Sequence, residues 1–408
     1  MRLLLLAAVC YGLLGGSLLA DEPTDAAVRE AVTRSLPFLE KGGLDWMEER
    51  GCMSCHHVPF MLWSHRAASA HGLAVDAKKL AEWDEWARKD SLANRYSFKL
   101  PMNDLEKIDV AVMPVAVKEK LKPIVGQTFA TEADFVGKLT PLLTADELQA
   151  HQALLIKTST IGENWPNRNG GGLDVLGQLL LGGHAATDDP TNAEFRSGVL
   201  KLMQQRQLAD GSWVPGNQFA TMRRWSLPAA NQATTMWATL ALAAYEPRTE
   251  QPADQPQKHA EQIERALAYQ RQQAPEPDNR EWLATRVLFE RRFGTANDVA
   301  KWRQQLIDAR NADGAWGWTK DVPSDPFTTG LAIYVLARVG GDDLSAIIRE
   351  ARKYLLASQQ PDGSWLTPSK NISNTTVPER LKVRDEIYHY WGTAWAVLGL
   401  LETLPTSG

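Results

Sequence analysis

The sequence predicts an all-α protein, an α/α toroid in which helical hairpins close into a ring. One turn motif occurs three times, an amphipathic helical pattern precedes it, and a more uniformly apolar segment follows it. The chain has 408 residues, of which 44% are hydrophobic, so it can bury a large core. Single hairpins of this kind cannot bury their apolar faces alone, and closing a series of them into a ring covers every face.

The repeated motif reads Gln/Arg-x-x-Asp-Gly-Ser/Ala-Trp and occupies Gln207–Trp213, Arg310–Trp316 and Gln359–Trp365. The first two copies lie about twice as far apart as the last two, which indicates a repeat of about fifty residues. Asp-Gly ends a helix and turns the chain. We expect each motif tryptophan to pack one hairpin on the next.

An amphipathic outer helix is expected before each turn and a buried inner helix after it. Apolar residues three or four apart, as in Ile347–Leu355, are typical of the outer helices. Uniform apolarity indicates a helix buried on all sides, and this predicts the inner helices. These segments are Thr235–Tyr245, Thr328–Val339 and Trp391–Leu404. Fainter copies of the hairpin lie at Ser35–Gly72, Glu147–His184 and Ile263–Phe293.

The chain divides into three predicted parts. Residues 1–20 are interpreted as a signal peptide, because Arg2 precedes an apolar run and small residues end at Ala20. Residues 21–144 are interpreted as N-terminal toroid repeats with an irregular insertion, and 145–408 as further toroid repeats. An export signal predicts a periplasmic or extracellular protein. No later segment reaches about 18 uninterrupted apolar residues, so no integral membrane span is expected after signal removal.

Two of the three cysteines fall in the pentapeptide Cys52-Met53-Ser54-Cys55-His56. This is the spacing for attaching c-type haem, because two thiols add to the two vinyl groups and the adjacent imidazole reaches the iron as an axial ligand. An exported protein that relied on disulfides would carry more cysteines. The sequence therefore predicts one covalent haem c on Cys52 and Cys55, with His56 on the iron.

Two alternatives remain open for the pentapeptide. Without a cofactor, Cys52 and Cys55 would form a local disulfide. A zinc site would need a further ligand, such as His57, His65 or His71. If haem is bound, His57 cannot reach the opposite face of the ring, so the sixth ligand has to arrive from elsewhere. Its candidates are Met61, His65, His71, Met102 and Met113.

The Gln-x-x-x-Gly-x-Trp turns after an amphipathic helix resemble the repeats of squalene-hopene cyclases and of the wider terpenoid cyclase and protein prenyltransferase superfamily, over Ala145 to Leu404. The resemblance implies the toroid fold and an Asp-x-Asp-Asp-Thr-Ala acid motif at the start of an inner helix. The matching stretch begins at Asp325, but Phe327 and Thr328 replace the other two acids, including the proton donor. Ordinary cyclase chemistry is therefore disfavoured, and Asp325 is left as the candidate catalytic acid. The zinc site of the prenyltransferases does not carry over either, because no cysteine follows Cys55.

The leading functional hypothesis is electron transfer or redox chemistry with a redox partner protein. One alternative is a non-catalytic toroid that binds a protein, a lipid or an isoprenoid-like apolar ligand, and another is a cyclase or isomerase with a divergent acid. Aromatic residues of the inner helices either pack in the core or line a cavity for such a ligand. They include Trp237, Tyr334, Trp391 and Trp395. A net charge of -5 without a basic excess argues against nucleic acid as a partner. Hydrolase and kinase motifs are absent from the sequence.

Overall fold

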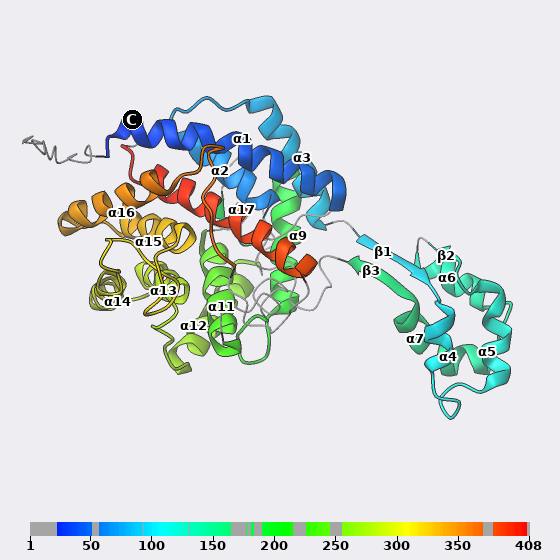
Figure 1. Ribbon diagram of the computed structural model, residues 1–408. Coiled ribbons are helices and arrows are strands. Elements are labelled where there is room, and N and C mark those ends of the chain that lie inside the picture. The colour runs from blue at the N-terminus through cyan, green and yellow to red at the C-terminus, as the bar shows by residue number, and fades with distance from the viewer. Residues whose placement is uncertain are drawn as a thin grey trace, which may run out of the picture.

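The computed structural model describes residues 23–50, 57–92, 94–129, 131–164, 177, 181–182, 190–214, 226–244, 255–369 and 378–405. The predicted all-α toroid is confirmed, because helices follow one another in pairs around a ring (Figure 1). The predicted signal peptide, residues 1–20, lies outside the described residues. So does the pentapeptide from Cys52 to His56.

The first hairpin consists of α1 (Asp25–Arg50) and α2 (Val58–Ala70), and α3 (Ala77–Leu92) packs on α2. Pro59 stands in the first turn of α2, where its missing N–H has no intrahelical partner to lose. Each residue from Val58 to His65 is buried, so α2 is an inner helix.

In the described residues from Pro190 onwards, the ring contains eight α-helices and one short 3₁₀-helix. They are α9 (Pro190–Arg206), α11 (Leu227–Ala244), α12 (Gln255–Gln272), α13 (Arg280–Phe293), α14 (Ala296–Asp308), α15 (Pro326–Val339), η3 (Asp342–Leu344), α16 (Ser345–Ser358) and α17 (Pro378–Glu402). Asn279, Thr295 and Asp325 cap the starts of α13, α14 and α15 with their side-chain oxygens. The inner helices expected from the apolar segments are confirmed as α11, α15 and α17, and each begins earlier than predicted.

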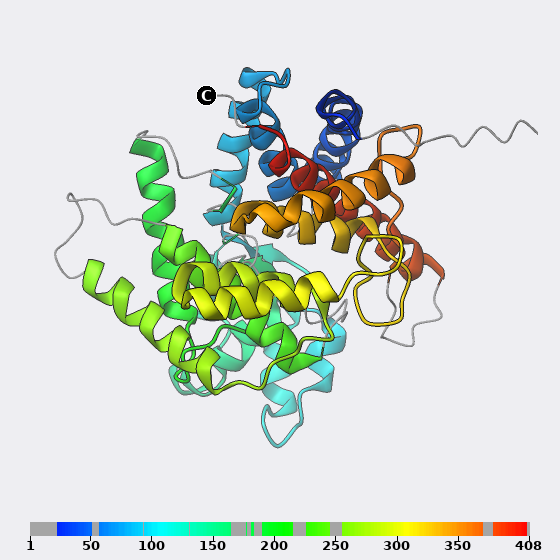
Figure 2. The same ribbon diagram turned by 90° about the vertical axis from the view of Figure 1, so that its left-hand side faces the viewer.

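Burial separates inner from outer helices. Every residue of α15 from Pro326 to Leu336 is buried. In α16, by contrast, only Ala351 and Leu355 are buried. Seen from the side, α16 and α17 lie beside α1, so the end of the chain returns to its beginning (Figure 2).

The three motif tryptophans make the same pair of hydrogen bonds. Each indole Nε1 donates to a carbonyl near the end of the preceding outer helix, and each backbone N–H donates to a threonine of the following inner helix. The indole acceptors are Met203, Leu306 and Leu355, at 2.9, 2.7 and 2.6 Å. The threonines are Thr235, Thr329 and Thr393, at 3.1, 3.1 and 2.9 Å. The fully buried tryptophan therefore ties the two helices of a hairpin together.

The ring closes through the last copy of this motif. Ser35 of α1 donates its hydroxyl to the Gly363 carbonyl at 2.7 Å, and Gln359 donates its side-chain amide to the Ala31 carbonyl at 2.8 Å. Gly363 has a φ of +84°, and a Cβ there would clash with the Arg34 carbonyl. Only glycine fits both the backbone conformation and this close approach.

The first copy of the motif makes the equivalent contact with the next outer helix. The side-chain amide of Gln207 donates to the Gln262 carbonyl of α12 at 2.9 Å. In the last repeat, α1 takes the place of that next outer helix. The same turn chemistry therefore both stacks neighbouring hairpins and joins the two ends of the ring.

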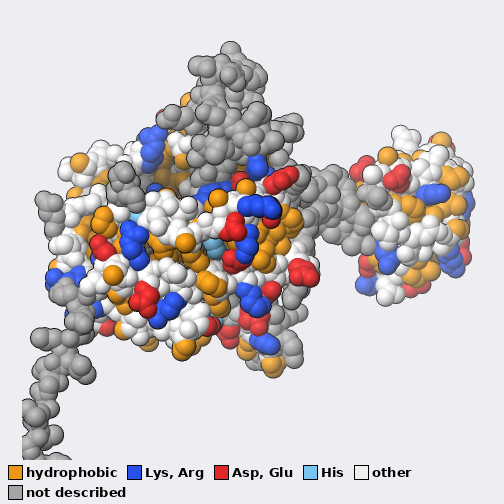
Figure 3. Space-filling model, turned by 90° about the horizontal axis from the view of Figure 1, so that it is seen from above, with side chains coloured by type: hydrophobic (Ala, Val, Ile, Leu, Met, Phe, Trp, Pro, Cys, Tyr) orange, Lys and Arg blue, Asp and Glu red, His pale blue; other side chains and the backbone are white. Residues whose placement is uncertain are grey.

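A separate lobe, which we call the insertion, interrupts the toroid after α3 and stands beside it (Figures 1 and 3). It contains β1 (Asn94–Lys99), α4 (Met102–Lys107), α5 (Val115–Leu121), η1 (Lys122–Ile124), β2 (Thr128–Phe129), α6 (Glu132–Leu139), α7 (Ala145–Ser159) and β3 (Thr160–Asn164). The antiparallel strands are ordered β2-β1-β3. Phe98 and Phe135 stack at 5.7 Å within its own apolar core.

The insertion extends beyond the predicted boundary between residues 144 and 145. Helix α7 packs on α6 and β1, and β3 pairs with β1 so that Gly162 faces Tyr96. Residues 147–164 of the predicted hairpin Glu147–His184 are therefore part of the insertion and do not form a toroid hairpin. The apolar pattern of residues 147–159 is that of any amphipathic helix, so it does not distinguish a toroid helix from α7. The pairing of β3 depends on a strand that is far away in the sequence, and a local pattern does not reveal it. Among the described residues, no helix is both long and apolar enough to cross a bilayer.

Candidate functional site

The predicted haem segment joins the end of α1 to the start of α2, and the structure describes its neighbours on both sides. His57, which directly follows His56, is the N-cap residue of α2. Within the described part of the chain, no three His, Cys, Asp or Glu side chains are grouped to hold a metal ion. The described residues nearest to the segment in the chain are those at the end of α1 and at the start of α2.

His57 is held between two aromatic rings. Its imidazole stacks on Trp46 of α1 at 4.5 Å and on Tyr390 of α17 at 4.1 Å between ring centroids. The Tyr390 hydroxyl donates to the carbonyls of Leu39, at 2.8 Å, and of His57, at 3.2 Å. Burial raises the pKa of Tyr390 well above its usual value, so the hydroxyl stays protonated as a donor. Three helices thus meet at the residue beside His56.

Two adjacent glycines in α1 permit this approach. A Cβ on Gly42 would lie 2.6 Å from the Tyr390 ring, and a Cβ on Gly43 would clash with the Met61 side chain. Glycine inside a helix costs roughly 0.5–1 kcal/mol relative to alanine. The Gly42-Gly43 pair therefore lowers the helix propensity of α1 but allows α1 to lie close to α2 and α17.

Two candidate sixth ligands lie on the buried face of α2. Met61 is fully buried against Gly43. His65 is 3% exposed, its Nδ1 lies 2.7 Å from the Met61 carbonyl, and its ring meets Trp83 edge-on. The Nε2 of His65 has no hydrogen-bond partner in the described part of the chain. Burial lowers the pKa of His65 below its usual value, which favours the neutral imidazole that a metal requires.

The other three candidates lie elsewhere. His71 is the C-cap residue of α2, and its carbonyl accepts a hydrogen bond from Arg29 at 2.7 Å. Met102 is an exposed residue of the insertion, and Met113 is buried in the core of the insertion. The structure therefore brings Met61 and His65 together on α2 and separates Met102 and Met113 from them.

Asp325, the candidate acid, serves as the cap of α15. It is 1% exposed, and its two carboxylate oxygens accept hydrogen bonds from the backbone N–H and the hydroxyl of Thr328, at 2.8 and 2.9 Å. Phe327 follows two residues later and meets Trp391 edge-on at 4.7 Å. Where the cyclase resemblance implies an acid, the structure has an apolar ring in an aromatic environment.

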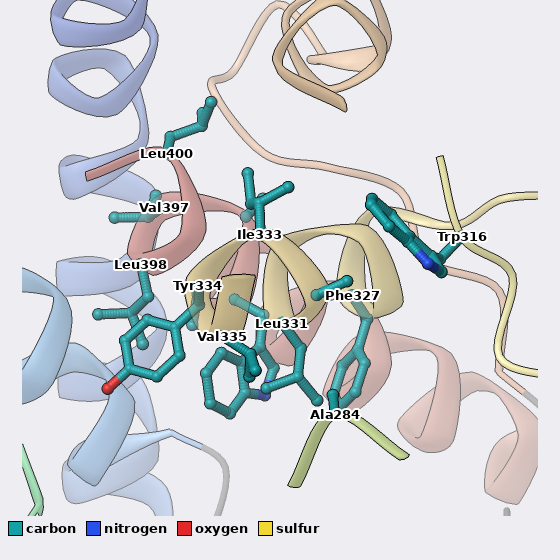
Figure 4. Close-up of a cluster of buried hydrophobic side chains, with 14 of the residues drawn as sticks. Ala284, Trp316, Phe327, Leu331, Ile333, Tyr334, Val335, Val397, Leu398 and Leu400 are labelled. Atoms are coloured by element: carbon teal, nitrogen blue, oxygen red, sulfur yellow. The ribbon is translucent and has the colours of Figure 1, made fainter. Parts of the chain in front are cut away.

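Aromatic side chains of four inner helices pack together at the centre of the toroid. We call them the central aromatic cluster: Phe60, Trp63, Trp237, Phe327, Tyr334, Trp391 and Trp395. Trp395 contacts Phe60 at 5.3 Å and Tyr334 at 5.5 Å, and Figure 4 shows Phe327 and Tyr334 projecting from the same side of α15. The Trp395 Nε1 has no hydrogen-bond partner among the described residues. The contacts between these rings are those of a packed hydrophobic core.

Sequence reasoning missed the residues that surround His57. Trp46 and Tyr390 are far apart in the chain, and neither belongs to a motif. The only available signal was Gly42-Gly43 inside a helical pattern, because glycines in a helix interior indicate close packing. Phe60 and Trp63 were also missed, although they follow the pentapeptide in an apolar stretch.

Comparison with known proteins gives a weak link to terpene cyclases. No family model matches the chain. Drimenyl diphosphate synthase from Streptomyces showdoensis is 33% identical over 76 residues, which are 19% of this chain and 14% of that protein. The match thus spans about a seventh of the length of that curated relative. It agrees with the resemblance seen in the turn motifs.

Two solved structures are similar over most of their length at low identity. A polysaccharide lyase has a TM-score of 0.35 and 12% identity, with 93% of this chain and 96% of that chain covered. A glycosyl hydrolase of family 88 from Bacteroides vulgatus has a TM-score of 0.34 and 12% identity, with 93% and 98% covered.

Proposed function

We propose that this chain is a toroid that carries one c-type haem and transfers electrons. The observation that carries the proposal is the Cys-x-x-Cys-His spacing at Cys52, Cys55 and His56. The donor set suits haem c, because two thiols form the thioethers and one imidazole is the axial ligand. A bound haem supplies a one-electron redox couple at its iron.

The residues around the segment support this proposal. The stack on His57 fixes the residue directly after His56, and the last turns of α1 carry the partly buried apolar side chains of Leu44, Trp46 and Met47. Apolar surroundings tune the potential of a haem by limiting its exposure to water. Met61 or His65 would supply the sixth ligand, with methionine giving the higher potential.

The haem proposal is tested by expressing the full chain in a bacterium that has an active haem-attachment system. We expect a Soret band, a mass increase of one haem, and loss of both in a Cys52→Ala, Cys55→Ala double variant. Colourless protein of unmodified mass, with the two thiols oxidised to a disulfide, would overturn the proposal. Stoichiometric zinc would instead support the metal alternative.

Export and a partner are part of the same proposal. A haem of this kind is attached outside the cytoplasm, which agrees with the interpretation of residues 1–20 as a signal peptide. Cell fractionation should recover the haem-loaded protein in the periplasm or the medium. A redox partner protein is expected because the haem needs a source and an acceptor of electrons.

The second candidate function is binding of an isoprenoid-like apolar ligand at the central aromatic cluster. The observation that favours it is the buried Trp395 indole without a hydrogen-bond partner in the described part of the chain. The similarity to drimenyl diphosphate synthase points the same way. Extraction of the purified protein and mass spectrometry of the extract would reveal a bound lipid. A Trp395→Phe variant that retains the same lipid load would argue against this site.

A further inference from the structure

The connection between α4 and α5 of the insertion exposes an apolar surface, which Figure 1 shows at the lower edge of this lobe. We call the exposed apolar residues of this connection the tip: they are Val110, Ala111, Val112, Pro114, Val115 and Ala116. The three valines are 60%, 55% and 58% exposed. Connections between helices are usually polar, so a run of exposed apolar residues indicates a functional surface.

The turn beneath the tip fixes its backbone. The Asp109 carbonyl accepts hydrogen bonds from the N–H groups of Val112 and Met113, both at 2.9 Å. The Asp109 carboxylate accepts a further one from the Ala111 N–H at 2.8 Å. The Met113 side chain is fully buried in the core of the insertion and anchors the turn there. Because this backbone is already ordered, docking of the tip costs little conformational entropy.

The lysines around the tip have partners inside the insertion. Residues 102–124 carry four lysines and four acidic residues, so the net charge of this segment is zero. The ion pairs are Lys107–Asp104, Lys122–Glu119 and Lys120–Glu147, at 3.5, 2.6 and 2.7 Å. The Lys118 ammonium donates to the backbone carbonyls of Glu106 and Ile108. The tip therefore complements an apolar surface without a strong charge of its own.

The size of the tip favours a lipid surface over a protein partner. Its three valines expose roughly 300 Å², at about 160 Å² for a whole valine, and the whole tip stays below the about 800 Å² per partner of a standard protein interface. Lipid tails need no matching groove, because they rearrange around an apolar projection. We propose that the tip docks the protein on a membrane surface, with Val110, Val112 and Val115 in the apolar layer. This docking does not depend on the haem.

The test is co-sedimentation of the purified full-length protein with an excess of phosphatidylcholine vesicles. We expect reversible binding that is the same at low and high salt, because no net charge contributes to it. A Val110→Ser, Val112→Ser double variant should bind at least about 25-fold more weakly, at about fivefold for the exposed half of each valine. Both positions are exposed, so the variant should keep the circular dichroism spectrum of the unaltered protein.

Leu366→Ser is the matched control, because Leu366 is 63% exposed but lies in the toroid. This variant should bind the vesicles as the unaltered protein does. Equal binding of the double variant and the unaltered protein would overturn the proposal, and so would an unaltered protein that stays in the supernatant. Binding only to vesicles that contain phosphatidylglycerol, with loss at high salt, would also overturn it. Dimers in solution that the double variant abolishes would assign the tip to a second copy of the chain instead.

Discussion

The ring closure predicts a large loss of stability for Gly363→Ala. Two terms contribute. The φ of +84° costs an L-residue about 1–2 kcal/mol, and the added Cβ would push the turn away from the Arg34 carbonyl. Moving the turn breaks the bonds from Ser35 to Gly363 and from Gln359 to Ala31, each worth about 1 kcal/mol. We expect a total loss of about 3–4 kcal/mol.

Gly340→Ala separates the two terms. Gly340 has a φ of +74°, but nothing lies within 4 Å of a Cβ added there. Its loss should be about 1–2 kcal/mol, from backbone strain alone. The assay is urea unfolding of both variants, followed by circular dichroism. Equal losses for the two variants would refute the reasoning, because the contact of the turn with α1 would then add nothing to stability.

Three further predictions follow from the site. Asp325→Ala should cost about 1 kcal/mol in urea unfolding and Asp325→Asn clearly less, because asparagine still caps α15; equal losses would contradict the capping role. Phe327→Asp should lower the free energy of unfolding by at least about 3 kcal/mol at pH 7, since it buries an unpaired charge among aromatic rings. A smaller loss would mean that water reaches this position. Burial lowers the pKa of His65, His259 and His389. Their unfolded forms therefore bind protons first, so the unfolding free energy should fall as the pH drops from about 7 towards 5; His65→Phe should flatten that slope, and an unchanged slope would exclude His65 as a contributor.

Repetition made the fold predictable. The three Asp-Gly turns and the apolar segments behind them gave the hairpins, because each copy faces the same packing problem. Ring closure followed in principle from the need to cover the two end faces. The particular contact of Gly363 with α1 could not be foreseen, since it depends on which residues of the first helix meet the last turn.

The candidate site was only partly predictable. The pentapeptide predicts thiol and imidazole donors by its local spacing, and this stays a prediction because the segment lies outside the described residues. The resemblance identified Asp325 and the acid missing at Phe327. Trp46, Tyr390 and the glycine pair reach His57 from helices at opposite ends of the sequence, and no local pattern records such a contact. The same applies to the insertion, which continues past the predicted boundary between residues 144 and 145. Its strand β3 pairs with β1, which precedes α4 in the chain, and no local pattern indicates this pairing.

The paired strands β1 and β3 have a consequence for the architecture of the chain. Asn94 and Asn164 are register partners, so the first and last residues of the insertion that the structure describes lie side by side. A short linker joining these two points would delete the lobe without opening the toroid. The lobe can therefore be removed or replaced by another domain, while the contacts that close the toroid stay in place.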